Sequence, residues 1–159
     1  MVSNQYIDAY GKSHFLDGNS KFSFRPGVYV FVKNDLGEIL FVVDSKYDGC
    51  EVPGGGMDPG ESFLECGIRE LKEESGYDID LISDEPFFIY HDLHYSSSNE
   101  FKHRICFYFE GILKSNVQGE QDFTNGETIS DVKFFKKEDI KDLNFVFWHR
   151  KAIEKYLEL

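Results

Sequence analysis

Three glutamates in this chain are spaced so that a helix would place them side by side. Glu70, Glu73 and Glu74 stand at i, i+3 and i+4, and these positions are neighbours on one helix face. At about 5–6 Å apart and an effective dielectric near 20, each pair of charges repels by about 3 kcal/mol. We therefore expect a cation among them. Mg²⁺ or Mn²⁺ is indicated, because hard divalent ions prefer carboxylate oxygen and keep several waters, which suits a phosphate-binding site.

The neighbouring residues predict the helix that carries these glutamates. Ser62 followed by Glu65 matches a capping box at a helix start, and Gly76 stands where helices commonly end in a left-handed residue. An apolar stripe that would face the core is formed by residues at i, i+4 and i+7: Leu64, Ile68 and Leu71. At 100° per residue the glutamates would lie about 140° from this stripe, on a face of their own.

By themselves three glutamates are more typical of a solvated surface helix, but the preceding glycine-rich turn changes this interpretation. Residues 55–77 read GGMDPGESFLECGIRELKEESGY. This segment resembles the box of the Nudix hydrolase family, also called MutT-like, which runs G-x5-E-x7-R-E-U-x-E-E-x-G-U, with U a bulky apolar residue. The matching residues are Gly55, Glu61, Arg69, Glu70, Leu71, Glu73, Glu74 and Gly76. Tyr77 replaces the usual aliphatic residue at the last position, and outside the box the resemblance is looser.

The resemblance implies both a fold and a metal site. The fold is an α/β/α sandwich with a mixed β-sheet, in which the box forms a loop-helix-loop at the end of the sheet. The implied metal ligands are the carboxylates of Glu70, Glu73 and Glu74, joined by the carbonyl of Gly54, where glycine lets the backbone approach closely. Which glutamate acts as the general base stays open, although Glu70 is the first candidate.

Further residues of the predicted site have supporting or additional roles. Arg69 is expected to organise Glu61 and Glu73 rather than to contact phosphate. Many relatives add a carboxylate from a distant loop, and Glu127 resembles that position best, with Glu120 as the alternative. For both acids a solvated loop position is the competing interpretation.

Composition limits the class of protein. A chain of 159 residues with 41% hydrophobic residues suits one domain over residues 1–159. A net charge of −12 argues against a large nucleic-acid footprint, which needs clustered Lys and Arg, so a small nucleotide is expected as the substrate. Three cysteines favour a reduced cytoplasmic setting. Neither a signal peptide nor a membrane span is indicated, and a homodimer stays open.

Hydrophobic patterning predicts the elements that position the box. Residues 1–24 are expected to form an extended lead-in. Strands are predicted over residues 28–32, 39–43, 87–91, 104–113 and 132–135, and further helices over 137–143 and 147–157. Strands interleaved with helices indicate a mixed sheet packed between helices.

Other residues carry weaker signals. His91 and His94 invite a zinc interpretation, but no third ligand stands at a recognised spacing, so a histidine pair at a loop or sheet edge is favoured. Arg25 could contact a phosphate or could simply be solvated. Candidates for stacking on a base, each more typical of a core residue, are Tyr90, Tyr95, Phe107, Tyr108 and Trp148.

The predicted function is Mg²⁺-dependent or Mn²⁺-dependent hydrolysis of a phosphoanhydride in a small nucleotide by direct attack of water. A nucleoside triphosphate, a nucleotide sugar and a dinucleoside polyphosphate all remain open as substrates. Two alternatives compete with this function. One is a catalytically inactive Nudix-fold ligand-binding or regulatory module, which the intact glutamate set disfavours. The other is an RNA-end pyrophosphohydrolase, which the net charge disfavours.

Overall fold

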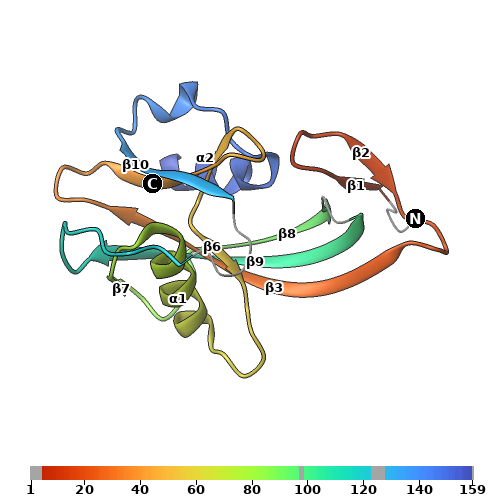
Figure 1. The fold of residues 1–159 in the computed structure, drawn as a ribbon, viewed down its shortest axis with the longest axis horizontal. Helices are drawn as coiled ribbons and strands as arrows, with labels where there is room; N and C mark the ends of the chain where they lie inside the picture. Colours follow the sequence, from red (N-terminus) through yellow and green to blue (C-terminus); the bar gives the residue numbers. More distant parts are fainter. Residues whose placement is uncertain (1–4, 97–98, 123–127, 159) are drawn as a thin grey trace.

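The protein is described by a computed structural model over residues 5–96, 99–122 and 128–158 (Figure 1). The strands are β1 (Gln5–Ile7), β2 (Ser13–Phe15), β3 (Lys21–Lys33), β4 (Ile39–Asp44), β5 (Gly49–Glu51), β6 (Gly54–Gly56), β7 (Ile79–Leu81), β8 (Phe88–Tyr95), β9 (Glu100–Leu113) and β10 (Ile129–Phe135). The helices are α1 (Phe63–Ser75) and α2 (Arg150–Glu158), with 3₁₀ turns η1 (Ile140–Asp142) and η2 (Phe147–His149).

All of these strands belong to one mixed sheet. Its order is β10-β4-β3-β9-β8-β1-β2, while β5 pairs with β4, β6 with β3 and β7 with β9. The centre is the parallel pair β3 and β9, in register from Lys21 beside Glu100 to Lys33 beside Ile112. The run from Val28 to Val32 is buried at every position, as expected for a central strand that is covered on both faces.

Alternate residues of β3 face two separate cores. Val28 and Val30 pack in one core with Cys66 and Leu71 of α1. Tyr29 and Phe31 pack in the other core, where α2 contributes Ala152, Ile153 and Tyr156. Figure 1 shows the two helices on opposite sides of the sheet. The predicted α/β/α sandwich with a mixed sheet is therefore confirmed.

Helix α1 begins and ends where its local signals predict. The Ser62 side chain accepts a hydrogen bond from the Glu65 N–H, the Glu65 side chain accepts one from the Ser62 N–H, and Gly76 has φ 75° in the left-handed region. The capping box and the glycine C-cap each involve residues within about one helical turn, so the sequence alone can specify them.

The buried face of α1 differs from the predicted one. Ile68, placed in the apolar stripe, is 40% exposed, whereas Glu70 and Glu74 are only 8% and 9% exposed. The physical reason is Gly67, where an added Cβ would lie 3.0 Å from Val28 and 3.1 Å from Val30 side-chain atoms. The small side of the helix therefore approaches β3 closely, with the glutamates beside it. The placement of Ile68 in the buried stripe was wrong, whereas Leu64 and Leu71 pack in the core as predicted.

Two other expectations need correction. The predicted lead-in is largely part of the sheet, because β1, β2 and the first residues of β3 all pair with other strands. The helix predicted over residues 137–143 is reduced to the turn η1. The terminal helix is divided into η2 and α2, and it buries Ala152, Ile153 and Tyr156 as predicted. Among the described residues, no helix is both long and apolar enough to cross a membrane.

Candidate active site

A short strand of three glycines brings the box helix to the edge of the sheet. Strand β6 pairs with β3, with Gly55 opposite Val28. The Gly54 N–H donates a 2.9 Å hydrogen bond to Glu74 Oε2. At Gly55 an added Cβ would lie 2.4 Å from Glu70 Oε2, so the Glu70 carboxylate rests directly against the backbone of β6. The absence of side chains on this strand is therefore what allows two glutamates of α1 to reach it.

Arg69 joins three carboxylates of the box. Its Nε and Nη2 donate to the two oxygens of Glu61, at 2.7 Å and 3.0 Å. Its Nη1 lies 2.9 Å from Glu70 Oε1 and 3.2 Å from Glu73 Oε2. The expected contacts with Glu61 and Glu73 are thus present, and the contact with Glu70 is additional. Arg69 supplies positive charge inside the glutamate cluster.

These contacts shift the acidity of the groups involved. The hydrogen bonds from Arg69 lower the pKa of Glu61 to about 2, and the hydrogen bond with Glu61 raises the pKa of Arg69. Burial raises the pKa of Glu70, against the opposing charge of Arg69. Burial also raises the pKa of the Cys66 thiol to about 12. At neutral pH the Glu61–Arg69 pair is therefore ionised, whereas Cys66 is a protonated thiol.

The donor chemistry of this cluster fits a hard divalent ion. All the candidate ligands are oxygen atoms, and the carboxylates of Glu70 and Glu73 already converge on one positive group, Arg69 Nη1. Within the described residues, no three acidic, histidine or cysteine side chains stand in a ready-made metal-binding arrangement. Gly54 contacts the cluster through its N–H, and its carbonyl remains a predicted ligand.

The segment before β10 passes over the carboxyl end of α1. The Gly119 N–H donates to the Gly76 carbonyl at 2.9 Å, and the Asp122 N–H donates to the Glu73 carbonyl at 2.9 Å. Glu120 is an exposed residue of this segment, and Asp122 is an acid beside it that sequence reasoning did not single out. Glu127, the preferred extra carboxylate, lies outside the described residues.

Three basic side chains stand on the other side of β6. Arg25 donates to the Gly56 carbonyl at 2.9 Å and pairs with Asp58. Together with Lys102 and Arg104 it lines a cavity of about 140 Å³ that also touches Gly56 and His94. Lys102 and Arg104 alternate along β9, and the strand that brings them near β6 is the parallel partner β3, which is distant in sequence. No local pattern in the sequence therefore indicates that these two residues lie near the box.

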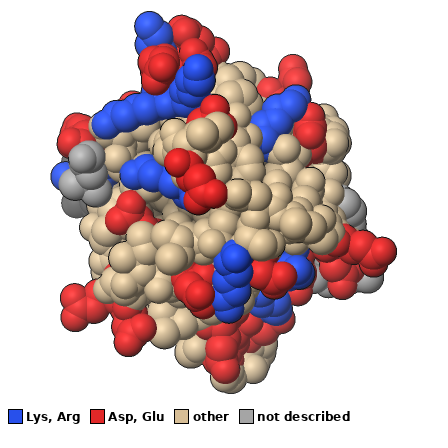
Figure 2. All heavy atoms as spheres, turned by 90° about the vertical axis from the view of Figure 1, so that its left-hand side faces the viewer, with Lys and Arg blue, Asp and Glu red and all other residues tan. Residues whose placement is uncertain are grey.

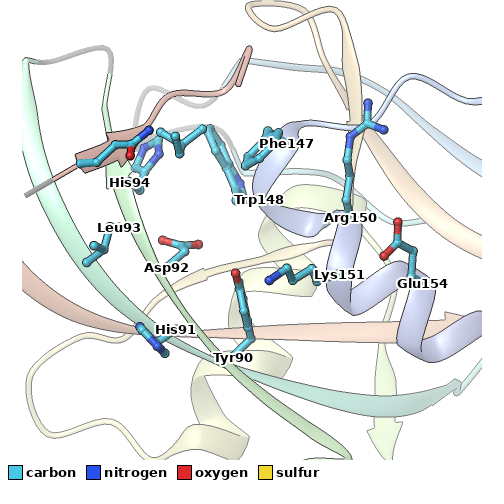
Figure 3. Close-up of a pocket in the computed structure, with 12 residues that line it drawn as sticks. Tyr90, His91, Asp92, Leu93, His94, Phe147, Trp148, Arg150, Lys151 and Glu154 are labelled. Carbon is cyan, nitrogen blue, oxygen red and sulfur yellow. The ribbon is translucent and has the colours of Figure 1, made fainter. Parts of the chain in front are cut away.

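A larger cavity of about 510 Å³ lies between β8 and the carboxyl-terminal segment (Figure 3). Two of the predicted stacking candidates, Tyr90 and Trp148, line it. The others do not: Tyr108 is buried in the core, Phe107 packs on Phe63, and Tyr95 stacks on His14.

The histidine pair supports no zinc site. His91 contacts His103 at 3.2 Å, while His94 packs against the Trp148 ring. Burial lowers the pKa of His94 to about 3, so it is neutral at physiological pH. No acidic, cysteine or further histidine ligands complete a metal group with them in the described ranges.

Comparison with known proteins agrees with this geometry. A family model described as the NUDIX domain matches residues 23–156. The chain therefore belongs to the Nudix family, and the resemblance carried by the box is confirmed.

Individual relatives share only part of their length with this chain. A Bacillus subtilis (strain 168) protein, provisionally named 8-oxo-dGTP diphosphatase, is 41% identical over 54 residues, which are 34% of this chain and 36% of that protein. An RNA pyrophosphohydrolase of Rhizobium meliloti (strain 1021) is 40% identical over 80 residues, 44% of this chain and 48% of that protein. The chain thus spans between about a third and a half of the length of these two relatives.

The fold also has solved counterparts. A NUDIX hydrolase from Nitrosomonas europaea matches with a TM-score of 0.67 and 22% identity, covering 84% of this chain and 88% of that one. At this level of identity the likeness establishes the fold and nothing finer.

Proposed function

We propose that this protein hydrolyses a phosphoanhydride bond in a nucleotide linked to another moiety, and that it uses Mg²⁺ or Mn²⁺. The observation that carries the proposal is the cluster at β6, where Arg69 joins Glu61, Glu70 and Glu73 while Glu74 is held by the Gly54 N–H. Family membership supports the same reaction.

The residues of the cluster have separate tasks in this proposal. Glu70, Glu73 and Glu74, with the Gly54 carbonyl, would hold the ion. When bound, Mg²⁺ or Mn²⁺ supplies charge neutralisation on the phosphate oxygens and lowers the pKa of the attacking water. Glu70 is the candidate to orient that water or accept its proton, because its carboxylate lies against β6.

The nucleophile in this proposal is water. Cys66, which contacts Arg69 of the cluster, is a side chain with nucleophilic chemistry, but its pKa of about 12 leaves almost no thiolate at neutral pH. Direct attack would give a nucleoside monophosphate with pyrophosphate, or with a phosphorylated second group. The substrate phosphates that extend past β6 would meet Arg25, Lys102 and Arg104.

The substrate is expected to be a small nucleotide in the cytoplasm. All three cysteines are free and buried, which agrees with a reduced compartment. On the face shown in Figure 2, basic side chains are interspersed with acidic ones rather than gathered into one patch. That surface does not suit a long nucleic-acid strand.

A second candidate substrate is the 5′ end of RNA. The specific observation in its favour is the relative named as an RNA pyrophosphohydrolase. A 5′ end needs only a few contacts near the site, so the net charge of −12 opposes a long binding path more strongly than it opposes a short one.

The test is a screen for release of phosphate and pyrophosphate across nucleoside triphosphates, nucleotide sugars, dinucleoside polyphosphates and triphosphorylated RNA, with Mg²⁺ and with Mn²⁺. Reaction in ¹⁸O-labelled water should label one phosphoryl product. A phosphorylated enzyme intermediate, or activity on phosphomonoesters alone, would contradict the mechanism. Failure on every substrate in a folded protein would favour the ligand-binding module instead.

A further inference from the structure

The larger cavity is bordered by two basic side chains that form no ion pair with any acid among the described residues. Arg150 and Lys151, in the first turn of α2, both line it. Neither lies within ion-pair distance of a carboxylate anywhere in the described ranges. In contrast, the three basic residues near the box are each paired with an acid: Arg25 with Asp58, Lys102 with Glu100 and Arg104 with Asp92.

Lys151 is directed into the cavity. Figure 3 shows its side chain extending from α2 toward Tyr90 and Asp92, and its Nζ stands 4.9 Å from the centre of the Tyr90 ring. Arg150 stands at the border, since it also lines a neighbouring cavity of about 170 Å³. An anion held by Lys151 would therefore lie inside the larger cavity, with Arg150 at its edge.

The cavity is locally positive in a strongly acidic chain. Asp92 is neutralised by Arg104, whose Nε donates to it at 3.0 Å. His94 is uncharged at neutral pH. Glu154 is then the single remaining acid among the lining residues, against the two cations. A chain with net charge −12 thus keeps an excess of positive charge at this cavity, where an anionic ligand group would be favoured.

The position of the cavity relative to the box suggests what carries that anion. His94 lines both the larger cavity and the smaller one, and the smaller one reaches Gly56 of β6. Figure 3 shows Arg150 and Lys151 across the larger cavity from His94. A ligand whose anhydride lies at the glutamate cluster and which extends past β6 and His94 would point its far end toward these cations. A volume of about 510 Å³ accommodates a group the size of a nucleoside.

We propose that the larger cavity binds a nucleoside whose sugar carries a second phosphate, remote from the anhydride, and that Lys151 binds this second phosphate while Arg150 adds positive charge at the border of the cavity. The inference rests on the proposed function for the position of the anhydride. Two sources share the chemistry: a free nucleotide phosphorylated at both its 5′ and 3′ positions, and the 5′ end of RNA, whose first nucleoside carries a 3′ phosphodiester.

Trp148 allows the inference to be tested without turnover. It is the only tryptophan in the chain and it lines the cavity, so its fluorescence reports on ligands bound there, with titration calorimetry as a second measurement. The probes are adenosine 3′,5′-bisphosphate and adenosine 5′-monophosphate, neither of which contains an anhydride. We expect the bisphosphate to bind at least about tenfold more tightly, as a charge-assisted contact would give.

Variants assign the preference to the two cations. Lys151→Gln should remove most of the difference between the probes, and Lys151→Gln with Arg150→Gln should abolish it. Lys155→Gln is the matched control, because Lys155 lies on the same helix but pairs with Glu158 and does not line the cavity. Equal binding of the two probes to the natural protein, or a preference that survives in the double variant, would overturn the inference.

A third probe distinguishes the two sources. The 5′-phosphorylated dinucleotide pApA carries the far phosphate as a diester, so tighter binding of pApA than of the bisphosphate supports an RNA end, and the reverse supports a free nucleotide. The binding test and the test of the proposed hydrolase function can fail independently of each other. A preference for the bisphosphate without hydrolysis of any nucleotide would reject only the hydrolase, whereas hydrolysis without the preference would reject only this inference.

Discussion

Replacing Gly55 by alanine would displace one carboxylate of the site without changing any charge. An added Cβ at this position would lie 2.4 Å from Glu70 Oε2 and 2.5 Å from Glu70 Cδ, whereas ordinary contact begins at 3.4 Å. The Glu70 carboxylate must therefore withdraw by about 1 Å. The backbone itself accepts alanine, because Gly55 is not among the glycines with positive φ.

The expected effect is large for catalysis and small for folding. A displacement of about 1 Å from the productive geometry costs about 10²-fold in rate, which corresponds to about 2.7 kcal/mol of transition-state stabilisation. The free energy of unfolding should change little, because the displaced atoms are the end of a flexible side chain that can turn aside. Gly55→Ala should thus lower kcat about 10²-fold in a normally folded protein.

Steady-state kinetics and thermal melts followed by circular dichroism would measure both quantities. Gly18→Ala serves as the matched control, since nothing lies within 4 Å of a Cβ added there, and it should leave kcat and the melting temperature unchanged. If folded Gly55→Ala retained nearly normal kcat, the position of the Glu70 carboxylate against β6 would be irrelevant to the reaction, and the reasoning would be refuted.

Three further predictions follow from the same cluster. Glu73→Gln or Glu74→Gln should lower turnover by at least about 10²-fold with the fold intact, because each removes a proposed metal ligand; near-normal activity of either folded variant would exclude that ligand. Arg69 holds the pKa of Glu61 at about 2 in the folded state. The stabilisation from this pair is therefore fully present above the ordinary pKa of about 4.5 and is lost as pH falls through about 2. The melting temperature of Glu61→Gln should consequently depend less on pH in that range than that of the natural protein. Mg²⁺ or Mn²⁺ at millimolar concentration should raise the melting temperature at neutral pH by mass action, with an effect that weakens toward pH ~4, and a melt that ignores both ions would contradict the site.

Much of the box could be read from the sequence because its interactions are local. The capping box joins Ser62 to Glu65, and Arg69 reaches Glu73 one turn away. Helix bounds, the spacing of the glutamates and the family pattern all depend on such short separations. The fold class followed from the same pattern, and the two cores on either side of β3 agree with it.

The rotation of α1 could not be read in this way. An apolar repeat counts Ile68 as a core residue, yet the helix turns its small side to β3 because Gly67 fits against Val28 and Val30. Close approach between two backbones depends on the shape of the partner strand, and a pattern along one helix contains no information about that shape. This is why Glu70 and Glu74 are buried rather than placed on an open face.

The sequence by itself therefore determined the family, the α/β/α architecture and the acidic cluster of the box, because each depends on spacing within short segments. The tertiary structure alone decided which residues form the cavities on the other side of β6 from the glutamates. The larger cavity is lined by Tyr90 from β8, Trp148 from η2 and Lys151 from α2, and Arg104 of β9 pairs with Asp92 in the same lining. These elements meet only when the parallel strands β3 and β9 pair and helix α2 packs on the sheet. Contacts between segments so distant in the chain produce no periodic pattern in the sequence.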